Sequence, residues 1–399
     1  MKRSSVYLNH LGIVCALGDD PDTIRQRMAV GDPDCLSYTS DFIADRLLLL
    51  GLVEKPLPSL AYFPSQEQTR CNQLLVAAMS QILEAFEQLR NGIDPLRIGI
   101  VLGTSTSGIS EGEQAINTLY HQGCFPKNFN YSQQEMSSPA ECLARWLNIK
   151  GPTYVISTAC SSSAKALASA RRLLRMNICD LVVSGGVDSL CQLTVNGFDA
   201  LESVSEQRCQ PFSLSRNGIN IGEGAALFLL SRNHGPVSLT GVGESSDTYH
   251  ISAPDPSGAG AEAAMIRALQ DAQLFADEID YLNLHGTATP QNDKMESLAV
   301  KRVFNKGIAC SSTKPYTGHT LGATGAIEAA ICWLTLVQTD NDSRLYTLPT
   351  HIWDGQIDTE LPSLNLVTQN TQKENLRYTM SNSFAFGGNN ISLLLERTQ

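Results

Sequence analysis

The sequence lacks the features of a membrane-spanning protein. No apolar run reaches the roughly 18 to 20 residues that are needed to cross a bilayer. The start of the chain is basic and partly apolar, as a secretion signal would be, but Asn9, His10 and Gly12 interrupt it and no clear cleavage site follows. We therefore expect a first strand that begins near Val6 and no membrane span.

The sequence also lacks the cysteine patterns of disulfide or metal frameworks. Its eleven cysteines form no Cys-x-x-Cys pair and no cluster with histidine at the spacing of metal ligands. An odd number of scattered cysteines argues against a disulfide framework and a structural zinc site, and it favours a reducing compartment. The formal net charge of −11 leaves no basic surplus to neutralise phosphates. We expect a cytoplasmic protein with no bound metal and no nucleic-acid partner.

The 399 residues contain no low-complexity tract and no long polar linker. Apolar, β-rich runs alternate with Ala- and Leu-rich stretches, which is the pattern of a layered α/β protein. A Pro/Gly break at residues 234–236 divides the chain into two halves, residues 1–234 and 235–399, which look related in plan. The predicted strands lie at residues 98–102, 154–157, 181–184, 225–230, 281–284 and 391–395, and the predicted helices lie at residues 72–88, 161–175, 261–272 and 325–336.

A cysteine at the entrance of a predicted helix is the first candidate for chemistry. In Ser157-Thr-Ala-Cys-Ser-Ser-Ser163 a β run ends, and small residues turn the chain so that Cys160 falls at or next to the helix start. Backbone N–H groups and the positive end of the helix dipole stabilise a thiolate at such a position. A buried cysteine that packs a helix against a sheet would give the same pattern, so both interpretations stay open.

Two histidines follow predicted strands in the second half of the chain. His285 begins His285-Gly-Thr-Ala-Thr-Pro290 directly after the apolar run 281–284, at the strand end where α/β sheets build active sites. A single histidine there is more often a structural hydrogen-bond donor. His319 ends Ser311-Ser-Thr-Lys-Pro-Tyr-Thr-Gly-His319, and the glycines around it fit neither common phosphate-binding loop.

Two further segments contain polar or flexible residues in apolar surroundings. Glu328 lies in the predicted helix after His319, where a carboxylate is costly unless it is paired, and we expect Lys314 to be its partner. The segment Asn382-Ser-Phe-Ala-Phe-Gly-Gly-Asn-Asn390 separates two C-terminal β runs. Its paired glycines allow positive φ and a close approach to a ligand, although an ordinary hairpin loop has the same composition.

Taken in order, these four segments resemble the signatures of the β-ketoacyl synthase family of the thiolase superfamily. The signatures are T-A-C-S-S-S, H-G-T-x-T-P, S-S-T-K-x-x-x-G-H-x-x-G-A-x-G and N-S-F-G-F-G-G, and the resemblance spans essentially the whole chain. It implies a thiolase-like α/β/α/β/α fold of five layers. Two similar halves, each with a mixed five-stranded sheet, would place the site at their interface.

The resemblance also implies a mechanism and assigns residues to it. Cys160 would take an acyl group from acyl carrier protein, and His285 and His319 would stabilise the enolate that forms when malonyl-carrier protein loses CO₂. Lys314 and Glu328 would organise the histidines. The remaining expected roles are an oxyanion hole from the backbone N–H groups of Cys160 and Phe386, phosphopantetheine binding by Thr287 and Thr289, and a gating loop of Phe384, Ala385, Phe386, Gly387 and Gly388.

The resemblance implies an acyltransferase that binds no cofactor of its own, because its substrates arrive on the phosphopantetheine of acyl carrier protein. Its partners would be that carrier protein and a second thiolase-fold chain, either a copy of itself or a chain-length-factor-like homologue. The pathway would be fatty-acid or type II polyketide synthesis, and an aryl-polyene type is one hypothesis. The stretch 65–71 carries only one basic residue, Arg70, so docking of the carrier would depend on Arg70, Arg208 and a few others, or on a second subunit.

Two departures from the family pattern affect local expectations. Ala385 replaces a common glycine, and alanine tolerates positive φ less well, so we expect the gating loop to move differently. Asn217 replaces a common aspartate after Arg216, which puts a local ion pair in doubt. The alternatives are a thiolase, an initiating synthase, a cysteine-dependent hydrolase and a non-catalytic scaffold. A thiolase would need a second cysteine near residues 382–390, and the other three fit the Cys160, His285 and His319 set less well.

Overall fold

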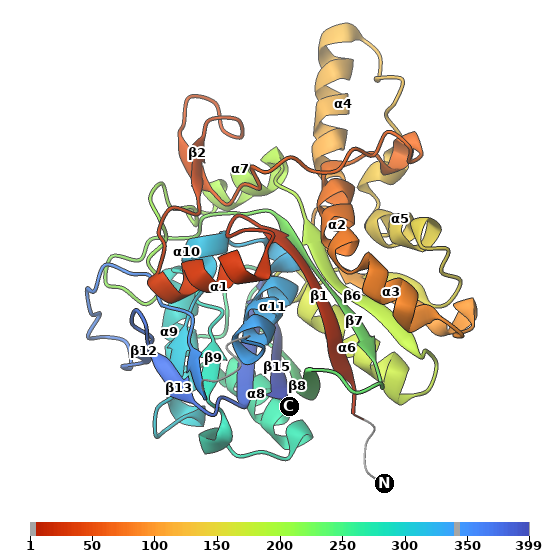
Figure 1. Cartoon of the computed structure of the whole chain (residues 1–399). Coiled ribbons are helices and arrows are strands. Elements are labelled where there is room, and N and C mark those ends of the chain that lie inside the picture. The colour runs from red at the N-terminus through yellow and green to blue at the C-terminus, as the bar shows by residue number, and fades with distance from the viewer. Residues whose placement is uncertain (1–4, 339–343, 399) are drawn as a thin grey trace.

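A computed structural model describes residues 5–338 and 344–398 of the chain. Within these residues eleven strands form one mixed sheet that runs through the molecule (Figure 1). In spatial order they are β12 (Asn365–Leu366), β10 (Ala309–Ser311), β9 (Tyr281–Asn283), β14 (Tyr378–Ala385), β15 (Asn389–Arg397), β8 (Val237–Ser246), β1 (Tyr7–Cys15), β7 (Gly224–Ser231), β6 (Leu181–Asp188), β4 (Ile98–Gly103) and β5 (Thr153–Ile156).

The helices and the short elements complete the described chain. The helices are α1 (Pro21–Val30), α2 (Arg70–Gln81), α3 (Leu83–Arg90), α4 (Ile109–Gln122), α5 (Ser138–Trp146), α6 (Ser162–Arg175), α7 (Gln192–Ala200), α8 (Ala259–Ala272), α9 (Pro290–Val303), α10 (Lys314–Thr317) and α11 (Thr324–Leu336). Two small antiparallel pairs join β2 (Ser37–Thr39) to β3 (Leu48–Leu50) and β11 (Leu345–Thr347) to β13 (Gln372–Glu374). None of the described helices combines the length and apolar character needed to cross a membrane.

The elements stack in five layers, which confirms the predicted thiolase-like architecture. α2 and α5 cover β1, β4, β5 and β7 on one outer face, and α8 packs on β8 and β15 on the other, with α9 beside it. α6 and α11 contact each other and fill the space between the two parts of the sheet (Figure 1). All the residues of β4 and β7 are buried, because strands covered on both faces need continuous apolar runs.

The first half contributes a mixed five-stranded sheet, as the family resemblance implies, whereas the second half contributes six strands, because the short strand β12 pairs with β10 at the edge. In the first half β4 pairs in parallel with β5 and β6, and β7 pairs antiparallel with β6 and β1. In the second half β9 pairs in parallel with β10 and β14, and β15 pairs antiparallel with β14 and β8. The two sheets are continuous, because Tyr7 and Leu8 of β1 pair with Ser238 and Val237 of β8.

The two central helices approach each other closely at a glycine. A Cβ atom on Gly325 of α11 would lie 2.7 Å from the Cβ atom of Ala164 in α6, a distance that real side chains do not show. All of α11 except Trp333 is buried, as expected for a helix that is apolar all round. This close packing brings the start of α6, next to Cys160, beside the start of α11, next to His319.

One predicted helix is divided in the structure. The helix predicted over residues 72–88 breaks at Ile82, whose φ of −117° and ψ of 9° separate α2 from α3. At the end of α2 the side chain of Gln81 binds the backbone N–H and C=O of Ile13 in β1, at 3.0 and 2.8 Å. The break therefore lies where α2 is fixed to the sheet.

Candidate active site

Cys160 lies in a tight turn between β5 and α6. Ala159 before it has a φ of +51°, which a residue other than glycine rarely adopts, and α6 begins at Ser162. Cys160 is only 4% exposed, and its Sγ lies 3.0 Å from Nε2 of His319. The turn thus aims the thiol at a histidine from the second half of the chain.

Burial in this closed site opposes the thiolate that the helix end is expected to stabilise. Burial raises the pKa of Cys160 to about 11. The positive charge of Lys314 and hydrogen bonds from the backbone of Phe386 and Cys160 lower it by less. Desolvation outweighs the helix terminus, because the charged form loses its water when the gating loop covers it. The thiol therefore needs a base, and His319 is within hydrogen-bonding distance.

The two histidines are neutral and face each other across the site. Their rings lie 5.5 Å apart at an interplanar angle of 84°, and both are buried. Burial lowers the pKa of each well below 6.5, and the charge of Lys314 lowers both further. Nδ1 of His319 lies 2.9 Å from Oγ1 of Thr324, so the hydroxyl of Thr324 accepts from Nδ1 when Nε2 is the proton acceptor.

Lys314 and Glu328 form the buried ion pair predicted from the sequence. Lys314 Nζ lies 2.6 Å from Glu328 Oε1, and both side chains are almost fully buried. Nζ also donates to the backbone carbonyl of His285 and lies 3.4 Å from its Nδ1. Burial raises the pKa of Glu328 to about 7, against the opposing effect of Lys314. An ammonium beside Nδ1 of His285 leaves the proton on Nε2, which faces the cavity.

Cys160, His285 and His319 are of the types that bind zinc, and their ligand atoms lie within 4.8 Å of one another. The ammonium of Lys314, 3.4 Å from His285 Nδ1, would repel a divalent cation at this position. Neutral imidazoles beside a thiol and an ammonium are instead arranged for nucleophilic attack and proton transfer.

A narrow cavity of about 60 Å³ opens onto these side chains. A water molecule needs about 10 to 15 Å³ by the same measure, so the cavity holds only a few waters and no long acyl chain. Thr287 and Thr289 line it, and their hydroxyl oxygens lie 2.9 Å apart. Phe384, Ala385 and Phe386 of the gating loop form part of its wall. A longer ligand can enter only if this wall moves.

The gating loop adopts a conformation that alanine tolerates. Ala385 has an extended φ of −108°, whereas Gly387 and Gly388 have φ of +78° and +75°. The alanine therefore causes no backbone strain in this closed state. That the loop moves differently stays a prediction. The ring of Phe386 lies 5.5 Å from that of Phe198 in α7, and this contact closes the cavity.

Sequence reasoning missed two buried carboxylates beneath His285. Glu296 in α9 accepts hydrogen bonds from the backbone N–H of His285 and Gly286, at 2.8 and 2.7 Å. Asp293 accepts from the backbone of Phe212 and Ala288. Burial raises the pKa of Glu296 to about 7 and that of Asp293 to about 6. Two acidic residues one turn apart, directly after His285-Gly-Thr-Ala-Thr-Pro290, were the signal available.

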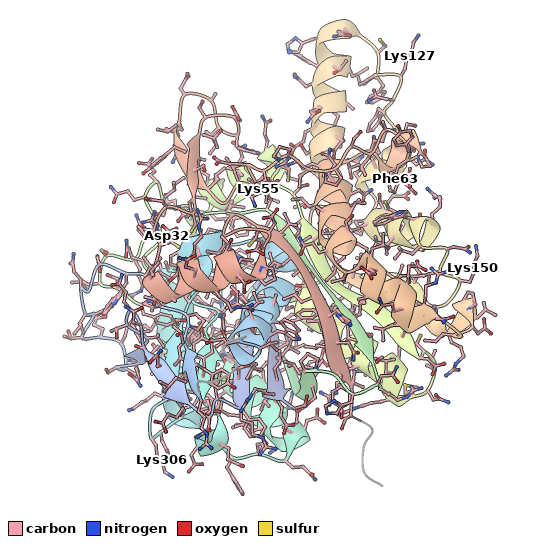
Figure 2. The ribbon with its side chains drawn as sticks, in the orientation of Figure 1. Asp32, Lys55, Phe63, Lys127, Lys150 and Lys306 are labelled. Carbon is pink, nitrogen blue, oxygen red and sulfur yellow. The ribbon has the colours of Figure 1, made fainter. Side chains whose placement is uncertain are left out.

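The predicted docking cations are engaged elsewhere in the structure. Arg70 donates to the buried carboxylate of Glu223 at 2.5 and 3.2 Å, and to the carbonyl of Val53. Arg208 donates to the carbonyl of Pro33. The charge of Arg70 is thus paired within the chain, whereas that of Arg208 meets only a neutral carbonyl. The labelled lysines Lys127, Lys150 and Lys306 lie at separate points of the molecular outline in Figure 2.

The doubt over an ion pair at Arg216 is also resolved. Arg216 Nη1 lies 2.6 Å from Asp358 Oδ2, and both side chains are largely buried. Asp358, more than a hundred residues later in the sequence, thus supplies to Arg216 the carboxylate that Asn217 does not provide.

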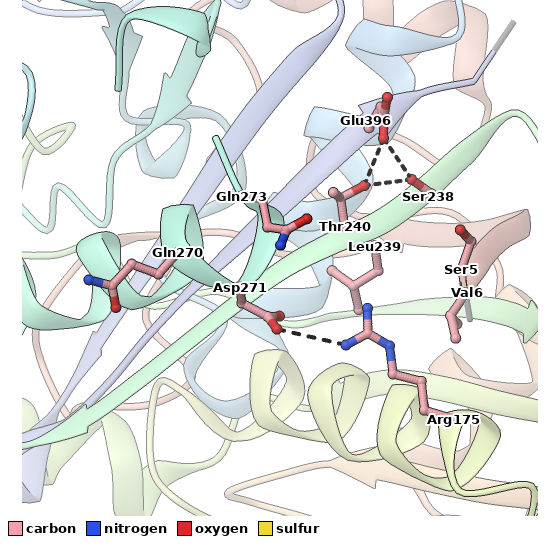
Figure 3. Close-up of a pocket in the computed structure, with 10 residues that line it drawn as sticks. All are labelled: Ser5, Val6, Arg175, Ser238, Leu239, Thr240, Gln270, Asp271, Gln273 and Glu396. Carbon is pink, nitrogen blue, oxygen red and sulfur yellow. Dashed lines mark hydrogen bonds and ion pairs between the residues drawn. The ribbon is translucent and has the colours of Figure 1, made fainter. Parts of the chain in front are cut away.

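A second cavity of about 480 Å³ lies where β8 meets β1, and Figure 3 shows its lining. Its polar groups pair with each other: Glu396 accepts from Ser238 and Thr240, and Asp271 lies beside Arg175 (Figure 3). The lining includes neither cysteine nor histidine and shares no residue with the cavity at Cys160. It contains none of the side chains that meet at Cys160.

Comparison with known proteins identifies the arrangement. The β-ketoacyl synthase N-terminal domain matches residues 54–234, and the β-ketoacyl synthase C-terminal domain matches residues 237–340. The chain belongs to the β-ketoacyl synthase family. Nodulation protein E of Rhizobium meliloti (strain 1021) is 31% identical over 409 residues, which cover 98% of this β-ketoacyl synthase and 99% of the relative.

Two further relatives span most of this β-ketoacyl synthase. The 3-oxoacyl-[acyl-carrier-protein] synthase 2 of Staphylococcus aureus (strain COL) is 31% identical over 322 residues, which cover 75% of each chain. A chain in the structure of the ketosynthase ApeO in complex with its chain length factor ApeC, from Xenorhabdus doucetiae, is 42% identical. It superposes with a TM-score of 0.93 and covers 99% of this chain and 98% of its own.

Proposed function

We propose that this β-ketoacyl synthase catalyses the decarboxylative condensation of malonyl-carrier protein with an acyl chain held on Cys160. The observation that carries the proposal is the 3.0 Å contact between Cys160 Sγ and His319 Nε2, in a buried site that also contains His285. The activity printed for the Staphylococcus aureus relative, a 3-oxoacyl-[acyl-carrier-protein] synthase, supports it.

The first half-reaction loads the acyl group. His319 Nε2 takes the proton of the Cys160 thiol, and Sγ attacks the carbonyl carbon of the acyl thioester. The backbone N–H groups of Cys160 and Phe386, which already lie against Sγ, stabilise the charge on the tetrahedral oxygen; such donors contribute about 3 to 4 kcal/mol each. The intermediate collapses with release of the phosphopantetheine thiolate, which takes back the proton from His319.

The second half-reaction forms the carbon–carbon bond. Nε2 of His285, and Nε2 of His319 in its other tautomer, donate to the thioester carbonyl of the malonyl group, and loss of CO₂ leaves an enolate. Thr324 both accepts and donates, so it holds His319 in either tautomer. The enolate carbon attacks the acyl thioester, the Cys160–acyl bond breaks, and the thiolate of Cys160 takes up a proton from solvent. Lys314, with Glu328, fixes His285 and adds positive charge near the enolate.

We propose acyl carrier protein as the partner that delivers both substrates, so the chain needs no bound cofactor. Thr287 and Thr289, whose hydroxyls face the cavity mouth as an adjacent pair, would bind the phosphopantetheine arm. The gating loop would move to admit it, because the closed cavity is too narrow. The eleven free cysteines support a cytoplasmic location.

We propose that the chain acts as the catalytic member of a heterodimer with a chain-length-factor-like homologue. The ketosynthase from Xenorhabdus doucetiae forms such a complex with its chain length factor. The nucleophile and both histidines are present and in contact here, as a catalytic member requires. The pathway is then a specialised type II synthesis rather than ordinary fatty-acid elongation.

The decisive experiment is intact-mass analysis of the purified chain with a panel of acyl-carrier proteins, followed by malonyl-carrier protein. Acyl loading on wild type but not on Cys160→Ala, and then release of a β-keto product, is the expected result. Cys124→Ser, at an exposed cysteine, is the matched control and should load normally. Loading that appears only with a co-purified homologue supports the heterodimer, whereas no loading under either condition refutes the function.

A further inference from the structure

Asp188, the last residue of β6, is a fully buried carboxylate with five hydrogen bonds. Its Oδ1 accepts from Thr104 Oγ1 at 2.5 Å, from Ser105 N at 2.8 Å and from N and Oγ1 of Thr106 at 2.9 and 3.0 Å. Its Oδ2 accepts from the backbone N–H of Gly322 at 2.5 Å. No cation among the described residues forms an ion pair with it, so these five donors alone hold its charge.

The Gly322 contact fixes the turn that follows His319. Gly322 lies in the short helix η5 (Leu321–Ala323), and Leu321 before it has a φ of +49°, a strained conformation for a residue other than glycine. A Cβ atom on Gly322 would lie 2.7 Å from Ser105 N and 2.8 Å from Asp188 Oδ2. The turn is therefore pressed directly against the segment that carries the carboxylate.

The same segments touch both reacting side chains. On one side, Thr324, two residues after Gly322, binds His319 Nδ1 at 2.9 Å. On the other side, Ser105 Oγ donates to the carbonyl of Ala159, the residue before Cys160, at 3.4 Å. Asp188 is thus hydrogen-bonded to Ser105, which contacts the residue before Cys160, and to Gly322 in the turn after His319. These two segments come from different halves of the chain.

We infer that Asp188 is a positioning residue, which holds His319 Nε2 against Cys160 Sγ through Gly322 and Thr324. The inference rests on the proposed transfer of the thiol proton to His319. Without the bond to Gly322, nothing at this carboxylate opposes relaxation of the strained φ at Leu321. Thr324 and the imidazole would then move away from the thiol.

A carboxylate is required because every partner is a donor. In Asp188→Asn the amide oxygen can keep the Oδ1 position and its four bonds, which leaves the NH₂ group facing the N–H of Gly322. The NH₂ group and the N–H of Gly322 are both donors, so the hydrogen bond to the turn after His319 is lost while the four bonds at Oδ1 are kept. Thr106→Val is the matched control, because it removes one hydrogen bond at Oδ1, together with the bond from Ser189 N to Thr106 Oγ1, and leaves the bond to Gly322.

The test is the rate of Cys160 alkylation by iodoacetamide between pH 6 and 11, followed by intact mass in a Cys124→Ser background. While His319 is neutral and accepts the thiol proton, the rate is independent of pH. A thiol with a pKa of about 11 and no base reacts about tenfold faster for each added pH unit, because only the thiolate reacts.

We expect a plateau for the wild type and for Thr106→Val, and a rate that rises with pH throughout for Asp188→Asn. At pH 7 the rate for Asp188→Asn should fall at least about tenfold, and it should approach the wild-type rate near the thiol pKa. Gly322→Ala, which forces the turn away while Asp188 and its other bonds remain, should behave in the same way. If Asp188→Asn does not fold, the pH dependence of alkylation in Gly322→Ala tests the inference.

Two outcomes would overturn the inference. A plateau that persists in both Asp188→Asn and Gly322→Ala would show that Asp188 does not set the position of His319, and the proposed function would stand. A wild type with no plateau would overturn the inference together with the proton transfer on which it rests.

Discussion

Lys165 Nζ donates to Asn389 Oδ1 at 2.8 Å, which joins the start of α6 to the residue directly after the gating loop. Lys165 is half-buried, and this burial lowers its pKa, as does the nearby charge of Arg172. The segment that carries the nucleophile and the loop that covers it are therefore linked by one polar contact.

Lys165→Met should loosen the gating loop. A hydrogen bond of this kind, partly exposed to water, contributes about 1 kcal/mol, so opening should become about fivefold more frequent. Hydrogen–deuterium exchange of the peptide containing residues 384–388 measures this change. Lys150→Met, at an exposed lysine, is the control and should leave exchange at the loop unaltered. Equal exchange in both variants would show that the contact does not restrain the loop.

Cys160→Ala should separate the two half-reactions. The variant cannot form an acyl-enzyme, but His285, His319 and Lys314 keep their positions because none depends on Sγ for its burial or its main contacts. We expect acyl loading to vanish while malonyl-carrier protein is still converted to acetyl-carrier protein. Mass analysis of the carrier protein detects this product. A variant that neither loads nor decarboxylates would contradict the assignment of enolate stabilisation to the histidines.

Removal of one partner of the Lys314–Glu328 pair should cost far more stability than removal of both. Lys314→Met leaves a buried carboxylate without its cation, and such losses are about 3 to 5 kcal/mol. Lys314→Met combined with Glu328→Leu should recover most of this stability but no condensing activity. Urea denaturation gives the first result and product formation the second. A double variant as unstable as the single one would argue that other groups compensate Glu328.

Stability should fall as the pH decreases below 6.5, in part through His351. Burial lowers its pKa to about 4 in the folded state, where Nδ1 accepts from Ser312 N and Nε2 lies 3.0 Å from the carbonyl of Pro211. The unfolded chain therefore binds the proton first, and the contribution of this group is present above pH 6.5 and is lost between pH 6.5 and about 4.

The loss amounts to about 1 kcal/mol for each pH unit in that window. Urea denaturation of the wild type and of His351→Gln between pH 7.5 and 4.5 isolates it, because the variant lacks this proton-binding site. The difference in stability between the two proteins should narrow as the pH falls. A constant difference would show that His351 is not buried as a neutral side chain.

Gly325→Ala should destabilise the chain, although alanine is the better helix former by about 1 kcal/mol. The added methyl group would lie 2.7 Å from Ala164 Cβ and force α6 and α11 apart, at a cost of about 1 to 3 kcal/mol. Thermal unfolding measures the loss. Gly197→Ala in α7, where a Cβ atom meets nothing within 4 Å, is the control and should be neutral or stabilising.

Much of the fold was predictable because its strands are buried on both faces. The runs at residues 98–102, 181–184 and 225–230 all lie within observed strands, and the helices predicted at residues 161–175, 261–272 and 325–336 match α6, α8 and α11 to within a few residues. The pairing of Lys314 with Glu328 followed from the cost of an unpaired buried carboxylate, and the structure confirms it.

What the sequence did not reveal depends on contacts between distant segments. The state of Cys160 follows from the gating loop that covers it, more than two hundred residues later in the chain. Asp188 gave no local signal, because its donors come from the turn after β4 and from the turn after His319. Nothing in the sequence indicated that Arg70 forms an ion pair with the buried carboxylate of Glu223, which lies far from it along the chain.

The central place of β1 has a consequence for the synthesis of this protein. β1 leaves the ribosome long before its neighbours in the sheet, β7 and β8, which begin at Gly224 and Val237. At about 5 to 20 residues per second, β7 is complete roughly 10 to 45 seconds after β1. During this interval the apolar strand lacks both of its partners in the sheet, so the central sheet can close only after the middle of the protein has been made.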